Sequence, residues 1–146
     1  MRSAQEAEPV LAEVLQHDMQ SLTPVLFVDT IEPCLDFWKR LGFERTSEVP
    51  GRDGLVFVSL EKDAVEVMYQ TRQSLDDDLP AIVGEPAQSY LFVEVADLDS
   101  VLAALDGAFE VIVARRTTSY GAEEYGVREP GGNVVTFAQF ADTAQE

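Results

Sequence analysis

The apolar pattern of this chain runs twice through the same order of elements, and this internal repeat is the feature that most restricts its fold. In each copy a strand precedes a helix, and three further strands follow. The copies pair Val28 with Val95, Phe43 with Phe109 and Gln70 with Gln139, at an offset of about 67 residues. Half-domains of this size cannot each bury a sheet alone, so the copies are expected to pack together. We therefore predict one α+β domain built from two βαβββ repeats.

The first repeat is expected over residues 22–70 and the second over residues 88–140. Period-two alternation and β-forming residues predict strands at 22–29, 43–49, 55–60, 64–70, 89–95, 109–115, 123–128 and 133–140. Spacings of three and four predict helices at 31–41 and 97–105. Asp97 is expected to cap the second helix, and Gly42 and Gly107 to end the two helices.

Three further segments flank the repeats. Residues 1–21 are predicted to form an amphipathic helix, because one stripe holds Val10, Leu11, Val14, Leu15, Met19 and Leu22. Residues 71–87 combine an aspartate run at 76–78 with Pro80, Gly84 and Pro86, which is typical of a linker. Residues 141–146 are expected to be a C-terminal tail.

The charge balance excludes some partner classes. The 146 residues include 10 basic and 27 acidic side chains, for a formal net charge of −17. Such a surface repels phosphate backbones and anionic lipids, so we expect no nucleic-acid or membrane partner. The one cysteine, Cys34, allows no internal disulfide and fits a reducing compartment. The N-terminus lacks a signal-peptide pattern, and no apolar run reaches membrane-spanning length. We expect a cytoplasmic protein.

Three stretches carry a resemblance to a known superfamily. They are Val-Leu-Phe-Val-Asp at 25–29 with Cys-Leu-Asp-Phe-Trp-Lys-Arg-Leu-Gly-Phe at 34–43, Phe-Val-Glu-Val-Ala-Asp-Leu-Asp at 92–99, and 120–133, which ends in Glu-Pro-Gly-Gly-Asn. In this order and spacing they resemble the vicinal oxygen chelate superfamily of glyoxalase I, extradiol dioxygenases and bleomycin resistance proteins. The resemblance implies the glyoxalase/bleomycin resistance fold, a curved mixed sheet, with an added N-terminal helix here.

The resemblance also implies positions for four metal ligands in the superfamily's metal enzymes. They fall on Thr23, Glu66, Tyr90 and Thr136. Glu66 is the only plausible metal ligand of the four, because divalent metals need several carboxylate, imidazole or amide groups. We therefore predict no metal and no cofactor, and we disfavour glyoxalase I and dioxygenase activity.

Strand alternation extends these four positions to a candidate ligand-binding surface. The same sheet face adds Phe27, Met68, Phe92 and Glu94, while the other face is almost entirely aliphatic, as expected under helices. Tyr120 and Glu124 are expected near the rim. The predicted ligand-binding residues are Phe27, Glu66, Met68, Tyr90, Phe92, Glu94, Tyr120, Glu124 and Thr136. An alternative leaves Glu66 and Glu94 solvated or paired with Arg115, Arg116 or Arg128.

Three functions remain open. The favoured hypothesis is metal-independent binding and sequestration of a cationic or aromatic, antibiotic-like small molecule by a homodimer, like the bleomycin resistance branch. Aromatic faces with carboxylates suit such ligands through stacking, cation–π contacts and charge-assisted hydrogen bonds. The second hypothesis is a metal-dependent lyase, isomerase or dioxygenase that uses Glu66 with Gln70, Gln139 or His17. The third is a protein-interaction module that docks through its N-terminal helix.

Overall fold

The computed structural model describes residues 20–78 and 89–141. The predicted helix at 1–21 and the tail at 141–146 therefore lie almost wholly outside the described residues. The first repeat contains β1 (Val25–Val28), α2 (Glu32–Arg40), β2 (Glu44–Pro50), β3 (Leu55–Lys62) and β4 (Val65–Thr71). The second contains β5 (Tyr90–Glu94), α4 (Leu98–Leu105), β6 (Glu110–Thr117), β7 (Ala122–Arg128) and β8 (Val134–Phe140). The predicted α+β fold class with two βαβββ repeats is confirmed.

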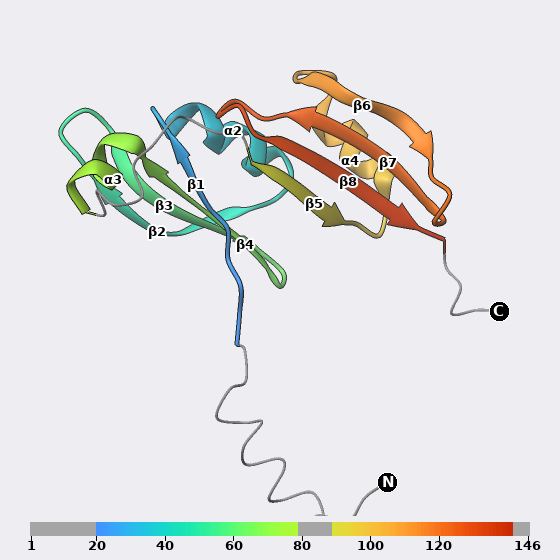
Figure 1. Cartoon of the computed structure of the whole chain (residues 1–146), viewed down its shortest axis with the longest axis horizontal. Coiled ribbons are helices and arrows are strands. Elements are labelled where there is room, and N and C mark those ends of the chain that lie inside the picture. The colour runs from blue at the N-terminus through green and yellow to red at the C-terminus, as the bar shows by residue number, and fades with distance from the viewer. Residues whose placement is uncertain (1–19, 79–88, 142–146) are drawn as a thin grey trace, which may run out of the picture.

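Each repeat forms its own four-stranded mixed sheet. The strand orders are β1-β4-β3-β2 and β5-β8-β7-β6, with β1–β4 and β5–β8 parallel and the other pairs antiparallel. Figure 1 shows the two sheets side by side along the molecule, with α2 between them and α4 behind β7 and β8. The halves are thus joined through helices and side chains, since the strands of one sheet do not pair with those of the other.

The core lies on the helix side of both sheets. Strand alternation gives Leu26, Val28, Val67 and Tyr69 to this side in the first sheet, and all four are at most 3% exposed. Helix α2 packs Cys34, Phe37 and Trp38 into the same core. The Phe37 ring contacts Phe109 and Phe137 of the second half, with centroids 5.0 and 6.4 Å away. One continuous core therefore serves both halves, and Trp38 belongs to it.

Both helices have the ends that their sequences predict. Asp97 Oδ1 accepts hydrogen bonds from the backbone N–H groups of Asp99 and Ser100 at the start of α4. Gly42, with φ of +91°, follows the C-terminus of α2. A side chain is strained at this φ, so glycine suits the turn.

The segment predicted as a linker contains a helix, α3 (Arg72–Asp78). Thr71 Oγ1 accepts a hydrogen bond from the Ser74 N–H and so caps its first turn. Leu75 is 5% exposed and fixes the helix against the rest of the first half. The expectation of an irregular connection is therefore wrong for residues 72–78. None of the described helices is long and apolar enough to span a membrane.

Candidate functional site

Each sheet has one face turned away from α2 and α4, and the predicted ligand-binding residues belong to these two faces and their rims. We call them the first open face, which contains Val25, Phe27, Ser59, Glu66, Met68 and Gln70, and the second open face, which contains Tyr90, Phe92, Glu94, Arg116, Glu124, Gly126, Thr136, Ala138 and Phe140. The predicted division into a helix side and an opposite face is confirmed, except that Val65, at the start of β4, is 41% exposed instead of buried.

Glu66 is the polar centre of the first open face. Its Oε1 accepts a hydrogen bond of 3.0 Å from Thr23 Oγ1, and its Oε2 accepts one of 2.5 Å from Ser59 Oγ. These two hydroxyl donors, Ser59 first, hold the pKa of Glu66 below its ordinary value. Glu66 is therefore a fixed carboxylate whose negative charge has neutral partners on this face.

The residues at the implied metal positions do not fit a divalent metal. Each carboxylate oxygen of Glu66 already accepts a hydroxyl hydrogen bond, and the other three positions supply two threonines and a tyrosine. Divalent metals of this superfamily's kind need several carboxylate, imidazole or amide ligands. Within residues 20–78 and 89–141, no group of three or more His, Cys, Asp or Glu side chains is arranged to hold a metal ion.

Val25, Phe27 and Met68 form the apolar part of the first open face. Phe27 lies opposite Gln70, and Met68 lies opposite Val25 in the parallel β1–β4 pair. Val25 is 38% exposed. Val25, Phe27 and Met68 therefore offer apolar contact along β1 and β4, next to the Glu66 carboxylate.

A row of aromatic rings crosses the second open face. The Phe92 and Phe140 ring centroids are 6.4 Å apart, and those of Tyr120 and Phe140 are 6.1 Å apart. All three rings remain exposed, at 47% for Phe92, 37% for Phe140 and 57% for Tyr120. Tyr90 adds a fourth exposed ring on β5. Exposed aromatic groups in one patch indicate an interaction surface rather than a packed core.

Small residues form the floor under these rings. Thr136 and Ala138 on β8 are fully buried, and Gly126 and Ala122 lie beside them on β7. A Cβ on Gly126 would approach Thr136 Oγ1 to 2.7 Å, so glycine is required here by close approach. The Thr136 hydroxyl is buried and makes no hydrogen bond with any described residue.

A buried carboxylate, Glu124, stands at one side of this floor. Its side chain is 1% exposed, and its Oε1 accepts hydrogen bonds from Arg116 Nε and Nη2 at 3.1 and 2.9 Å. Its Oε2 accepts a hydrogen bond from the Tyr120 hydroxyl. These contacts, Tyr120 first, lower the pKa of Glu124, and the same carboxylate raises the pKa of Tyr120. The charge of Glu124 is therefore balanced within the protein.

The structure brings the predicted site residues into two groups rather than one. Phe27, Glu66 and Met68 share the first open face, and Tyr90, Phe92, Glu94, Glu124 and Thr136 share the second, with Tyr120 at its rim. Sequence reasoning missed three residues that complete these groups. They are Ser59, Arg116 as the partner of Glu124, and Phe140.

A buried hydrogen-bond chain joins the halves on the helix side. Trp38 Nε1 donates to Tyr69 Oη at 2.8 Å, and Tyr69 Oη donates to Glu129 Oε2 at 2.5 Å. Glu129 Oε1 accepts from the Asn133 backbone N–H at 2.6 Å and from Asn133 Nδ2 at 3.2 Å. We call these four residues the seam. Beside it, burial and the Glu129 carboxylate raise the pKa of the Cys34 thiol to about 12.

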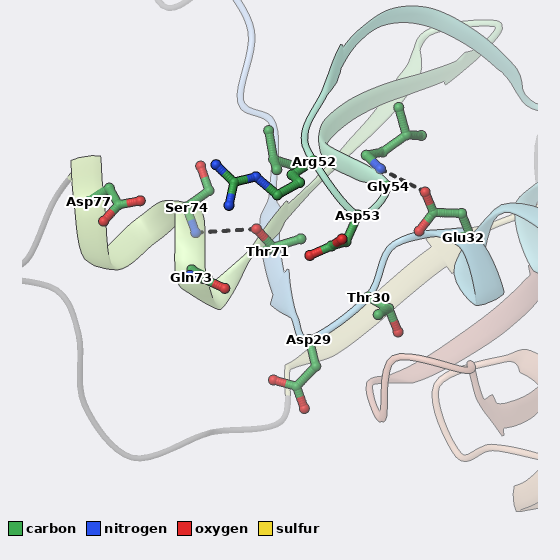
Figure 2. Close-up of a pocket in the computed structure, with 12 residues that line it drawn as sticks. Asp29, Thr30, Glu32, Arg52, Asp53, Gly54, Thr71, Gln73, Ser74 and Asp77 are labelled. Carbon is green, nitrogen blue, oxygen red and sulfur yellow. Dashed lines mark hydrogen bonds between the residues drawn. The ribbon is translucent and has the colours of Figure 1, made fainter.

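Two clefts open elsewhere. One of about 540 Å³ lies between the β2–β3 turn and α3, and in Figure 2 the Arg52 side chain reaches across it toward Ser74. A second, of about 310 Å³, lies between the halves and includes Trp38, Phe43 and Phe137 in its lining. Glu94 is the only one of the nine predicted ligand-binding residues that lines either cleft. The other eight lie on the two open faces or at their rim, outside both clefts.

Solved structures with this fold resemble the chain over most of its length. TioX from Micromonospora sp. ML1 is 18% identical, with a TM-score of 0.69 over 84% of this chain and 100% of that one. A glyoxalase/bleomycin resistance protein/dioxygenase from Nocardioides is 15% identical, with a TM-score of 0.65 over 94% and 95% of the two chains. Lactoylglutathione lyase from Agrobacterium tumefaciens is 17% identical, with a TM-score of 0.65 over 84% and 95%. At these identities the likeness establishes the fold alone.

Comparison with curated protein sequences gave no significant match. A family model, in contrast, matches residues 19–137 and so includes both βαβββ repeats. The chain belongs to the Glyoxalase/Bleomycin resistance protein/Dioxygenase superfamily.

Proposed function

We propose that this protein binds and sequesters a planar aromatic small molecule with a cationic group, of the antibiotic-like kind, without a metal ion. The observation that carries the proposal is the exposed aromatic row of Phe92, Phe140 and Tyr120 above a floor of small residues. Small-molecule sites combine aromatic walls with a few fixed polar groups. Glu66 supplies such a group, because its carboxylate accepts hydrogen bonds from the neutral hydroxyl groups of Thr23 and Ser59.

Two copies of the chain are needed to enclose such a ligand. In the described part of one chain both open faces carry exposed apolar side chains, with Val25, Tyr90 and Phe92 each more than a third exposed. Ligand sites normally bury most of the ligand surface, which a single open sheet face does not do. We propose a homodimer in which the first open face of one copy meets the second open face of the other, with the ligand between them.

Binding of 2-naphthylmethylammonium, followed by calorimetry and ligand-observed NMR, tests this function. Cyclohexylmethylammonium, which has the charge without the aromatic face, is the matched control ligand. We expect the aromatic cation to bind more tightly than the control ligand. F92A and E66Q are each expected to weaken the binding of the aromatic cation by about tenfold, which corresponds to one lost contact of about 1.4 kcal/mol. I112A, which shortens an exposed apolar side chain of β6 that is not among the residues of either open face, is the control variant.

Two results would contradict the proposal. The first is equal binding of both cations, or no binding of either, by folded protein. The second is a stoichiometric divalent metal in protein purified without chelator, which favours the metal-dependent alternative. Sedimentation velocity measures the oligomeric state in the same samples, and a folded monomer at ligand-saturating concentration contradicts the dimer.

A further inference from the structure

Arg116 is an exposed arginine whose orientation is fixed by a buried acid. Its side chain is 58% exposed, whereas its partner Glu124 is 1% exposed. Arg116 Nε and Nη2 both donate to Glu124 Oε1, and Tyr120 occupies the other carboxylate oxygen. A guanidinium has five N–H groups, so its Nη1 group and one Nη2 hydrogen have no partner among the described residues. They are available to a ligand.

The neighbouring arginine shows what an ordinary surface ion pair looks like in this chain. Arg115 pairs with Asp99 of α4 and with Glu123, whose side chains are 79% and 51% exposed. Contact with α4 places Arg115 on the helix side, while Arg116 lies opposite Glu124 on the second open face. Burying a carboxylate costs free energy that an exposed ion pair does not require. The burial of Glu124 is therefore explained by what it positions, namely Arg116 and Tyr120.

The positioned guanidinium adjoins the aromatic row. Tyr120 is shared by both, since its hydroxyl contacts Glu124 and its ring lies 6.1 Å from Phe140. The same face holds the Thr136 hydroxyl, which is buried without a hydrogen-bond partner among the described residues. An aromatic molecule stacked on this row thus meets the hydrogen-bond donors of Arg116. Its complementary chemistry is a hydrogen-bond acceptor.

We propose that Arg116 forms a specificity subsite on the second open face for a carbonyl or carboxylate oxygen carried by the aromatic ligand. Glu124 is a positioning residue that presents the guanidinium to this oxygen. The inference rests on the proposed function and extends it, because Glu66 on the first open face selects the cationic end of the ligand and Arg116 selects an acceptor. The preferred ligand class is an aromatic molecule that carries both groups.

Three naphthalene probes test the subsite on the full-length protein: 2-naphthoate, 2-naphthamide and 2-naphthylmethylammonium. R116Q is expected to weaken the binding of 2-naphthoate and 2-naphthamide by about tenfold, because a hydrogen bond from a charged donor is lost. The affinity for 2-naphthylmethylammonium is expected to stay unchanged. E66Q is expected to show the opposite pattern. R115Q changes the neighbouring arginine on the helix side and is expected to affect none of the probes.

Further variants separate recognition from folding. R116K keeps the charge but not the forked geometry of the guanidinium, and the double variant R116Q/E124Q leaves no buried carboxylate without a partner. Both variants test the subsite even if R116Q alone does not fold. E124Q is expected to reduce the preference for 2-naphthoate over 2-naphthylmethylammonium while Arg116 stays charged. If wild type and every Arg116 variant bind 2-naphthoate with equal affinity while 2-naphthylmethylammonium still binds through Glu66, the Arg116 subsite is overturned and the proposed function is not. Failure of all three probes to bind overturns the proposed function with it.

Discussion

The Thr136 side chain lies in an environment that costs free energy in the folded chain. Its hydroxyl is buried under the aromatic row and makes no hydrogen bond with a described residue. A buried polar group without a partner typically costs about 1–3 kcal/mol. The resemblance implies a metal-binding glutamate at this position in the superfamily's metal enzymes, and this chain has a threonine there instead. The structure adds that Thr136 Oγ1 occupies the space that a Cβ on Gly126 would enter.

We predict that T136V raises the free energy of unfolding by about 1 kcal/mol, because a methyl group replaces the unpartnered hydroxyl at nearly constant shape. Urea unfolding measures the change. T23V is the matched control with the opposite expected sign, because the Thr23 hydroxyl donates to Glu66. Destabilisation by T136V would mean that this hydroxyl has a partner in solution.

Individual elements follow their own sequence signals closely, as α4 illustrates. Asp97 before an apolar periodic stretch predicts a capped helix, and its carboxylate caps two backbone N–H groups. The predicted strands agree with the observed ones within a few residues at each end. The sequence does not predict helix α3, because the composition of residues 71–87 is dominated by aspartate, proline and glycine. The features that favour this helix are local ones, the Thr71 cap and the buried Leu75 side chain.

Substitution of the α4 cap tests this element by itself. We predict that D97A lowers the free energy of unfolding by about 1 kcal/mol, and that D97N stays near wild type because asparagine also caps well. Chemical denaturation followed by circular dichroism gives both values. Equal losses in the two variants would show that the Asp97 charge, rather than its capping geometry, stabilises the helix.

The site residues were predictable only as far as simple strand alternation holds. Alternation placed Glu66 and Phe92 on faces away from the helices. Alternation does not identify Arg116 as the partner of Glu124, because β6 pairs irregularly with β7 at two points, between Val111 and Val113 and between Val113 and Arg116. At the second of these points Ala114 and Arg115 oppose Tyr125 alone, and Arg116 then pairs with Glu124. An irregularity of this kind changes which side chain faces a ligand without leaving a recognisable sequence signal.

At the scale of the whole molecule, the sequence predicted two packed repeats but not how they meet. In each repeat the strand alternation requires only that one aliphatic side of the sheet lies under a helix. This requirement is met whether the two open faces lie together or apart, so it does not predict how the repeats pack. The observed union depends on the shared core around Phe37 and on the seam, in which Tyr69 of one half donates to Glu129 of the other. These are contacts between distant positions, which local patterns do not specify.

The seam carries a prediction of its own. Y69F removes a hydrogen bond to a buried carboxylate and leaves Trp38 Nε1 without its acceptor, so we expect a loss of about 2 kcal/mol in the free energy of unfolding. Y125F removes a half-buried phenol hydroxyl that makes no hydrogen bond with a described residue, and it serves as the control. Thermal and urea melts of both variants give the comparison, and indistinguishable melts would contradict a stabilising seam.

Trp38 also gives the molecule an intrinsic optical probe. It is the only tryptophan of the chain, it is 1% exposed, and its ring meets Phe37 and Phe43 edge-on. Its indole N–H is the first donor of the seam. Its emission wavelength and its accessibility to a collisional quencher therefore report on the junction between the halves without any attached dye. A ligand that moves one half against the other leaves a spectral trace at Trp38, which lies on the helix side and not on the open face that carries the aromatic row.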